Sequence, residues 1–241
     1  MRDIDGARMR AILVLAAAVA FILFSYLAPD FTGYRADQMP HAEARPPIQP
    51  VGFAFAIWGV IYLWLLLGAG FGLLQRAEAA DWDAHRWPLI GAMVLGAGWL
   101  WVAVQSPLMA TVIIWAMLVL ALFALARAPE RDFWWARVPI GLFAGWLTAA
   151  SFVSLGLVLA GYGVLGSGRI AALLLLPLAA AFAVVVYLRL APGGAYPLAA
   201  GWGLLGIAAA NVGIHVDVAV LAVVGLSVLA GIWWRRTFRA A

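Results

Sequence analysis

Three aromatic side chains mark the stretch of this chain where a ligand could bind. Phe55, Trp58 and Tyr62 are spaced three and four residues apart within an apolar run, so on a helix they share one face. Lipid contact needs only aliphatic side chains, whereas a buried indole N–H or phenol O–H usually finds a hydrogen-bond partner. The spacing therefore predicts either one wall of a binding pocket or a contact between helices. Both interpretations stay open, because Trp and Tyr are also enriched at membrane interfaces.

The segment that carries this aromatic face begins after three prolines. Pro46, Pro47 and Pro50 fix their own φ angles and bias the preceding residues away from helix. An apolar run follows from residue 51 to about residue 74. At about 1.5 Å of rise per residue, a helix of this length crosses a bilayer. The sequence therefore predicts a long polar loop over residues 30–49 that leads directly into a membrane-spanning helix.

Composition restricts the class of protein to which the chain can belong. Hydrophobic residues make up 66% of the sequence, charged residues 11%, and there is no cysteine. These values exclude a soluble globular domain and a disulfide-stabilised scaffold. All 15 basic residues are arginines scattered through the loops, which indicates membrane topology and no nucleic-acid partner. Richness in Arg, Ala and Gly without Lys indicates a GC-rich bacterial genome, and we expect the bacterial inner membrane as the location.

Apolar runs separated by polar turns predict an all-α, polytopic membrane bundle of eight helices. The first run resembles a signal peptide, but Tyr26 occupies a position where cleavage requires a small residue, so we expect this helix to be retained. The last hydrophobic block is too long for one crossing, and the polar stretch at 211–217 divides it. The predicted helices cover about residues 11–28, 51–74, 88–105, 107–127, 137–160, 169–189, 197–211 and 217–234.

The arginines test this number of crossings and orient the chain. With the N-terminus in the cytoplasm, twelve of the 15 arginines fall on the cytoplasmic side. Such a bias follows the positive-inside rule and places both termini in the cytoplasm. The three outer arginines are Arg35, Arg45 and Arg169, and the twelve inner ones are Arg2, Arg8, Arg10, Arg76, Arg86, Arg127, Arg131, Arg137, Arg189, Arg235, Arg236 and Arg239.

Depth separates the tryptophans that could bind a ligand from those at the membrane interface. Trp58, Trp99, Trp101 and Trp115 lie within about 6–14 Å of the outer ends of their predicted helices, by helical rise. Trp146 lies deeper in the fifth predicted crossing. The first five helices therefore share an aromatic layer beneath the long loop. Large aromatic walls with few polar groups are typical of a site for a flat apolar ligand.

These residues resemble a known family, the translocator proteins, also called tryptophan-rich sensory proteins (TspO/MBR). The family has a long first loop with a Pro-Pro pair, followed by a second helix with F-x-x-x-W-x-x-L-Y. Here Pro46-Pro47 precedes Phe-Ala-Ile-Trp58-Gly-Val-Ile-Tyr62, in which the Trp-to-Tyr spacing matches and the Phe spacing is one residue short. Trp101 fits the third-helix N-x-x-W without its Asn, and Trp115 resembles the Leu-Trp of the fourth helix. Trp146 and Ala150 fit W-x-x-x-A-x-x-L-N in the fifth helix, where Ser154 replaces Asn.

The resemblance covers about residues 10–160 and implies a five-helix bundle that binds a porphyrin, haem or related tetrapyrrole noncovalently. It implies a TspO-like core at 1–160 and makes residues 161–241 a three-helix extension. Family members are described as sensors, transporters or tetrapyrrole-degrading catalysts. We expect no catalytic residues and no metal site, since the three histidines are dispersed over loops on both sides. The ligand-binding residues expected from depth and resemblance together are Phe55, Trp58, Tyr62, Trp99, Trp101, Trp115, Trp146, Ala150 and Ser154.

Two functions from different classes follow from the sequence. The first is a sensory or transport protein that binds a small apolar ligand in an outer-half aromatic pocket. The second is a structural or accessory subunit of a larger membrane complex, with the last three helices as its docking face. The lipid bilayer is a partner in both cases, and a homo-oligomer is compatible with either. A bound chromophore after purification would favour the first, and stoichiometric partner chains would favour the second.

Overall fold

A computed structural model describes residues 4–29, 31, 33–190 and 193–238, and over these residues the chain is all-α without strands. Arg2 and Arg239, counted above with the inner arginines, lie outside the described residues. The long helices are α1 (Ile4–Leu27), α2 (Ile57–Arg76), α4 (Arg86–Ala103), α5 (Pro107–Arg127), α6 (Arg137–Gly161), α7 (Gly168–Leu190), α8 (Ala195–Asn211) and α9 (Val216–Phe238). The shorter elements are η1 (Ala36–Gln38), η2 (Gly52–Ala56) and α3 (Ala80–Asp83).

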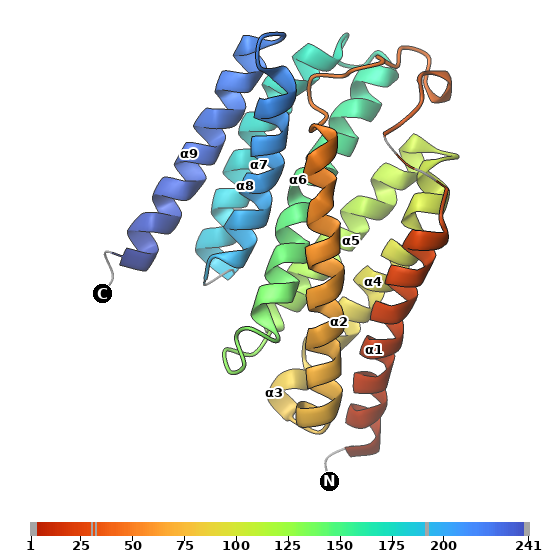
Figure 1. Ribbon diagram of the computed structural model, residues 1–241, viewed down its shortest axis with the longest axis vertical. Helices are drawn as coiled ribbons and strands as arrows, with labels where there is room; N and C mark the ends of the chain where they lie inside the picture. Colours follow the sequence, from red (N-terminus) through yellow and green to blue (C-terminus); the bar gives the residue numbers. More distant parts are fainter. Residues whose placement is uncertain (1–3, 30, 32, 191–192, 239–241) are drawn as a thin grey trace.

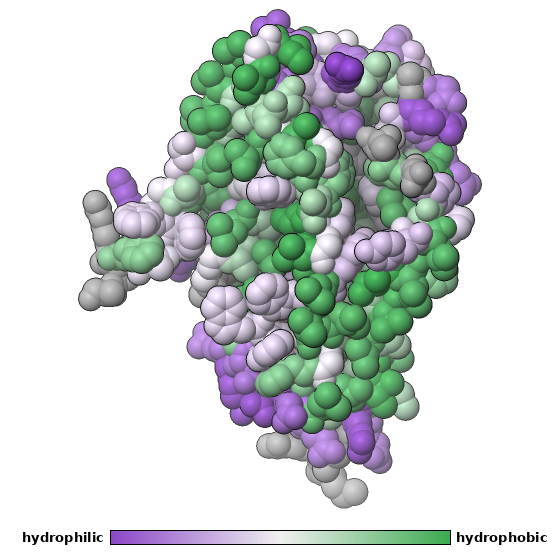
Figure 2. Space-filling model, viewed as in Figure 1, coloured by the Kyte–Doolittle hydropathy of each residue, from purple (hydrophilic) through white to green (hydrophobic). Residues whose placement is uncertain are grey.

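The prediction of a polytopic membrane bundle is confirmed. Within the described residues, seven segments are long and apolar enough to cross a membrane. The remaining long helix, α8, has 17 residues and is the shortest of the eight. Figure 2 shows an apolar surface over most of the visible face, with hydrophilic residues gathered toward its two ends. This pattern is the one expected of a protein whose middle contacts lipid.

Two boundaries differ from the prediction for reasons of local chemistry. The helix expected from residue 11 begins at Ile4. The arginine at position 10 is accommodated because its guanidinium makes two hydrogen bonds to Asp83, at 2.7 and 2.9 Å. The second crossing starts with the 3₁₀ turn η2 and becomes α-helical only at Ile57. The first change adds a partly polar turn to α1, and the second replaces the first turn of the predicted α-helix by a 3₁₀ turn; neither adds a crossing.

Successive long helices run in opposite directions, so both chain ends lie at one end of the bundle (Figure 1). We call this the inner end, and the end that carries the loop between α1 and α2 the outer end. Proline and serine help to set one of the tight outer turns: Pro107 is the first residue of α5, and the Ser106 hydroxyl accepts a hydrogen bond from Met109 N at 3.3 Å. Serine at the cap followed by proline is a strong helix start.

Helix α6 is the centre of the molecule. It lies between a group made of α1, α2, α4 and α5 and a group made of α7, α8 and α9 (Figure 1). Gly141 and Gly145 let α8 approach closely, because a Cβ at Gly145 would contact Tyr196 O and one at Gly141 would lie 3.2 Å from Ala195 Cβ. Small residues at helix contacts in membranes serve this purpose.

Packing crosses the expected boundary at residue 160. One hydrophobic cluster contains residues of α1 and α2 together with Tyr187 of α7, Ala199 of α8 and Leu229 of α9. The expectation that residues 1–160 form a core of their own stays a prediction, which a chain truncated after residue 160 can test. In the full chain, α6 has 18 buried residues, and part of that burial is against α7 and α8.

Candidate functional site

A cavity in the outer half of the bundle has a volume of about 380 Å³. Small-molecule sites occupy roughly 300–1,000 Å³, so this cavity is large enough for a ligand. Its walls come from α1, α2, α4, α5 and α6, together with the residues that follow α1 and those of η2. The lining residues are Phe21, Ser25, Tyr26, Ala28, Pro29, Phe31, Phe55, Trp58, Gly59, Tyr62, Gly96, Trp99, Leu100, Ile114, Met117, Trp146 and Ala150.

Eight of the 17 lining residues are aromatic, and several of their rings pack against one another. Trp58 and Tyr62 stack on one face of α2, with centroids 5.3 Å apart and planes 22° apart. Phe21 of α1 meets both rings edge-on, at 5.8 and 5.0 Å. Trp146 of α6 meets Phe55 and Trp58 edge-on, at 5.9 and 6.2 Å. Each offset or edge contact adds about 0.5–1.5 kcal/mol beyond burial, so the rings form a rigid wall.

The polar groups of the cavity lining are uncharged. None of the lining residues is acidic, basic or histidine. The Tyr62 hydroxyl donates to Ser25 Oγ at 3.0 Å, and Trp99 Nε1 donates to Ala110 O at 2.9 Å. Trp146 is only 2% exposed, and its Nε1 has no hydrogen-bond partner among the described residues. A buried donor without a partner is costly, and Nε1 has almost no surface open to the cavity.

A smaller cavity of about 60 Å³ adjoins the first beneath the outer loop. The two share Phe55, Trp99 and Trp146 as lining residues. The small cavity ends at a chain of hydroxyls, in which Ser154 Oγ lies 2.8 Å from the Tyr34 hydroxyl and 2.6 Å from Thr111 Oγ1. Burial raises the pKa of the Tyr34 hydroxyl, and its hydrogen bonds oppose this only in part. Tyr34 is therefore neutral and can both donate and accept.

Seven of the nine expected ligand-binding residues come together around these two cavities: Phe55, Trp58, Tyr62, Trp99, Trp146, Ala150 and Ser154. Trp101 and Trp115 line neither of them, which corrects the expected set. Trp101 lies on the outside of α4, 39% exposed, and donates to Phe24 O at 3.3 Å. Trp115 points toward the opposite group of helices and packs edge-on against Phe152, with ring centroids 5.2 Å apart.

Many lining residues were not anticipated from the sequence, and four of them come from the first helix and the loop after it. Phe21 and Ser25 come from α1, Phe31 and Tyr34 from the loop that follows it. The first helix is apolar on all sides, so nothing in its sequence distinguishes a cavity-facing Phe21 from a lipid-facing residue. The signal that could have found Ser25 is its position, because a hydroxyl in an otherwise apolar helix usually seeks a protein partner.

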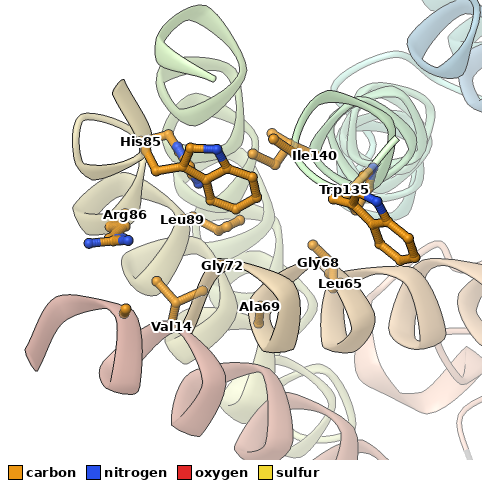
Figure 3. A pocket seen from close by; sticks show the side chains of 14 residues that line it. Val14, Leu65, Gly68, Ala69, Gly72, His85, Arg86, Leu89, Trp135 and Ile140 are labelled. Carbon is orange, nitrogen blue, oxygen red and sulfur yellow. The ribbon is translucent and has the colours of Figure 1, made fainter. Parts of the chain in front are cut away.

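A third void lies at the inner end between α1, α2, α4 and α6 (Figure 3). Its volume is about 20 Å³, which is room for roughly one water molecule. His85 faces this region, 3% exposed, and no described residue bonds its Nδ1. A single buried water would satisfy that atom. The void is too small for a ligand, so the aromatic cavity at the outer end is the candidate site.

Comparison with known proteins identifies the family. A family model described as TSPO-like protein matches residues 11–234. The chain belongs to the TSPO-like protein family. No curated protein and no solved structure matches it.

The match to the TSPO-like family model extends further along the chain than the motif resemblance, which ended near residue 160. It includes α7, α8 and nearly all of α9. The last three helices are thus part of what the TSPO-like family model describes. The structure agrees at the site itself, because Gly203 of α8 lines the smaller cavity.

Proposed function

We propose that this TSPO-like membrane protein binds a flat, apolar tetrapyrrole, a porphyrin or haem, in the aromatic cavity of its outer half. The binding serves a sensory or transport role. The supporting observation is the stacked and edge-on set of Trp58, Tyr62, Phe55 and Trp146 around a cavity of about 380 Å³. Flat aromatic ligands stack on such rings. The residues named here bind and orient; the proposal assigns them no catalytic step.

The residues present suit such a ligand in a further respect. The hydroxyls of Tyr34 and Ser154 offer a polar contact at the far end of the smaller cavity. An apolar body with a few acceptors at its rim therefore matches the chemistry of the walls.

Titration with protoporphyrin tests the proposal. Protoporphyrin should show saturable binding to the detergent-purified protein, followed by its absorbance and by quenching of protein fluorescence. Trp58→Ala should weaken binding by about tenfold, because the lost stacking is worth on the order of 1 kcal/mol and 1.4 kcal/mol is a decade. Trp101→Ala is the matched control, since Trp101 lies on α4 outside the cavity. It should leave the affinity unchanged.

Two outcomes would contradict the proposal. If the wild-type protein shows no saturable binding, tetrapyrrole binding is contradicted, and the function as a structural subunit of a membrane complex takes its place. Equal losses in Trp58→Ala and Trp101→Ala would mean that porphyrin adsorbs to the surface and does not enter the cavity.

We further propose that the protein lies in the bacterial inner membrane with both termini in the cytoplasm. All ten of the inner arginines that the structure describes belong to segments at the end of the bundle that carries both termini, and Arg35, Arg45 and Arg169 belong to segments at the other end. Arginine enrichment marks the cytoplasmic side. The aromatic cavity then lies in the half of the membrane that faces away from the cytoplasm.

A further inference from the structure

The loop above the aromatic cavity is fastened to helices on every side that it touches. We call residues 33–56 the roof segment. Its hydrogen bonds reach the ends of α4 and α6, the start of α7 and the outer half of α8. They are Gln38 Nε2 to Ala103 O at 3.2 Å, His41 N to Gly161 O at 2.8 Å, Gly168 N to Glu43 Oε1 at 2.7 Å, Asn211 Nδ2 to Pro47 O at 2.7 Å, Val51 N to Gly206 O at 3.1 Å and Trp202 Nε1 to Ala54 O at 2.8 Å.

Apolar packing reinforces these bonds. Ile48 is 0% exposed and belongs to the cluster between α6, α7 and α8. Gly206 of α8 lies so close to the roof segment that an added Cβ would be 3.0 Å from Pro50 Cβ and 2.7 Å from Ala54 Cβ. Lifting the roof segment would expose Ile48 and break several buried hydrogen bonds together, which is costly. The last three helices, together with α4 and α6, therefore hold the roof segment in place over the smaller cavity, to which it contributes Gly33, Tyr34, Gln49 and Pro50. Its Phe55 lines both cavities.

The larger cavity opens between helices and not toward the roof segment. The exposed members of its lining are Tyr26, 79% exposed, Pro29 and Gly59. Tyr26 and Pro29 lie at the outer end of α1, and Gly59 lies in the first turn of α2. A Cβ placed on Gly59 would have no atom within 4 Å. The mouth of the cavity is thus the gap between the outer ends of α1 and α2, on the lipid-facing side of the bundle.

We infer that the ligand exchanges sideways with the outer half of the bilayer, through the gap between α1 and α2, while the roof segment stays closed. This inference rests on the proposed function and adds the route. The Tyr62–Ser25 hydrogen bond joins the two helices at the inner edge of the gap. An apolar ligand dissolved in lipid reaches this mouth without crossing the polar loop.

A disulfide lock on the roof segment tests the route cleanly, since the chain contains no cysteine. A Cβ on Gly161 would lie 3.1 Å from Met39 Cβ, slightly below the roughly 3.5–4.5 Å of natural disulfides. Met39→Cys/Gly161→Cys ties the roof segment to α6. Its oxidised and reduced forms should bind protoporphyrin with rates and affinities equal within about twofold. Loss of binding on oxidation that dithiothreitol restores would overturn the inference.

A bulky side chain at the mouth gives the complementary test. Gly59→Trp should slow both association and dissociation of protoporphyrin by about tenfold, the effect of roughly 1.4 kcal/mol on a barrier. Gly70→Trp is the matched control, because Gly70 lies on the same helix, has equally open space and lines no part of the cavity. Stopped-flow fluorescence in phosphatidylcholine vesicles measures both rates. Equal rates in the two variants would refute the route.

The two proposals fail in different ways. Wild-type protein that shows no saturable binding contradicts the proposed function, and the route falls with it. Wild-type protein that binds, with binding abolished by the oxidised lock or unaffected by Gly59→Trp, contradicts the route alone.

Discussion

Replacing Arg86 by methionine should lower the free energy of unfolding by about 3 kcal/mol. Arg86 is 1% exposed at the first residue of α4, and Figure 3 shows it near α1 at the inner end. Its Nη1 donates to Ala7 O at 2.7 Å and Ala77 O at 2.8 Å, and its Nη2 donates to Arg76 O at 2.8 Å. The last two carbonyls belong to the end of α2, where acceptors lack helical partners and a cation is favourable.

The magnitude follows from what the substitution leaves behind. Methionine preserves much of the apolar stem but leaves three backbone carbonyls without this donor, at about 1–1.5 kcal/mol each. Asp83 loses its 3.3 Å contact with Arg86 and keeps Arg10 as its partner at 2.7 Å. No carboxylate is therefore stranded, which keeps the loss below the roughly 3–5 kcal/mol of breaking a buried ion pair, even before counting the relief of desolvation. A loss of this size is a large share of the free energy of unfolding of a typical folded protein, which is roughly 5–15 kcal/mol.

Reversible unfolding in mixed micelles, followed by tryptophan fluorescence and far-ultraviolet circular dichroism, measures this loss. Arg127→Met is the matched control, because Arg127 is exposed and its contacts with described residues are local: a 3.2 Å hydrogen bond to Phe123 O and a position over the Phe123 ring. It should change stability by less than about 0.5 kcal/mol. Protoporphyrin affinity should be equal in both variants, since Arg86 lies at the inner end. A loss for Arg86→Met within about 1 kcal/mol of the control would refute the reasoning.

Two further predictions concern topology and pH. A reporter fused after Ala241 and one inserted within residues 162–167 should report opposite sides of the membrane, since the inner and outer ends of the bundle lie on opposite sides; the same side for both would refute the orientation. The hydrogen bond from Arg76, 2.7 Å long, lowers the pKa of Asp132. Asp132 therefore stabilises the fold above its unfolded pKa of about 3.9 and loses that contribution as the pH falls through the lower folded value. Asp132→Asn, which tolerates the φ of 58°, should melt below wild type at pH 7 and converge with it in acid; a constant difference would contradict this.

Helical geometry explains which of the predicted site residues line the cavity and which do not. Trp58 and Tyr62 are four residues apart and face the same cavity, as the spacing predicted. Trp99 and Trp101 are two residues apart, so they point to different sides of α4, and only Trp99 lines the cavity. Depth along a helix placed both in the same layer, but depth carries no information on rotation. In a membrane helix that is apolar on all sides, no polar stripe supplies the missing angle.

Helix boundaries were easier to predict than helix partners. The cap at Ser106-Pro107 and the polar stretch after Asn211 are local signals, and the helices end or begin there. The role of Asn211 was not local: its side chain donates to Pro47 O, 164 positions away, and so helps to hold the roof segment in place. The sequence around Asn211 does not predict that its side chain bonds Pro47 O. The same limit applies to Gly203, whose place in the cavity wall depends on how α8 packs against α6.

The inner ends of α1 and α2 are clamped by charge. Arg10 of α1 pairs with Asp83, and Arg76 of α2 pairs with Asp132 at 2.7 Å. Near their outer ends the two helices are joined beside the cavity mouth by the Tyr62–Ser25 hydrogen bond. Over the 24 residues of α1, about 36 Å, a tilt of only about 2° about the inner end would move the outer tip by about 1 Å. Under the proposed function, a wider ligand therefore requires only a small rotation of α1.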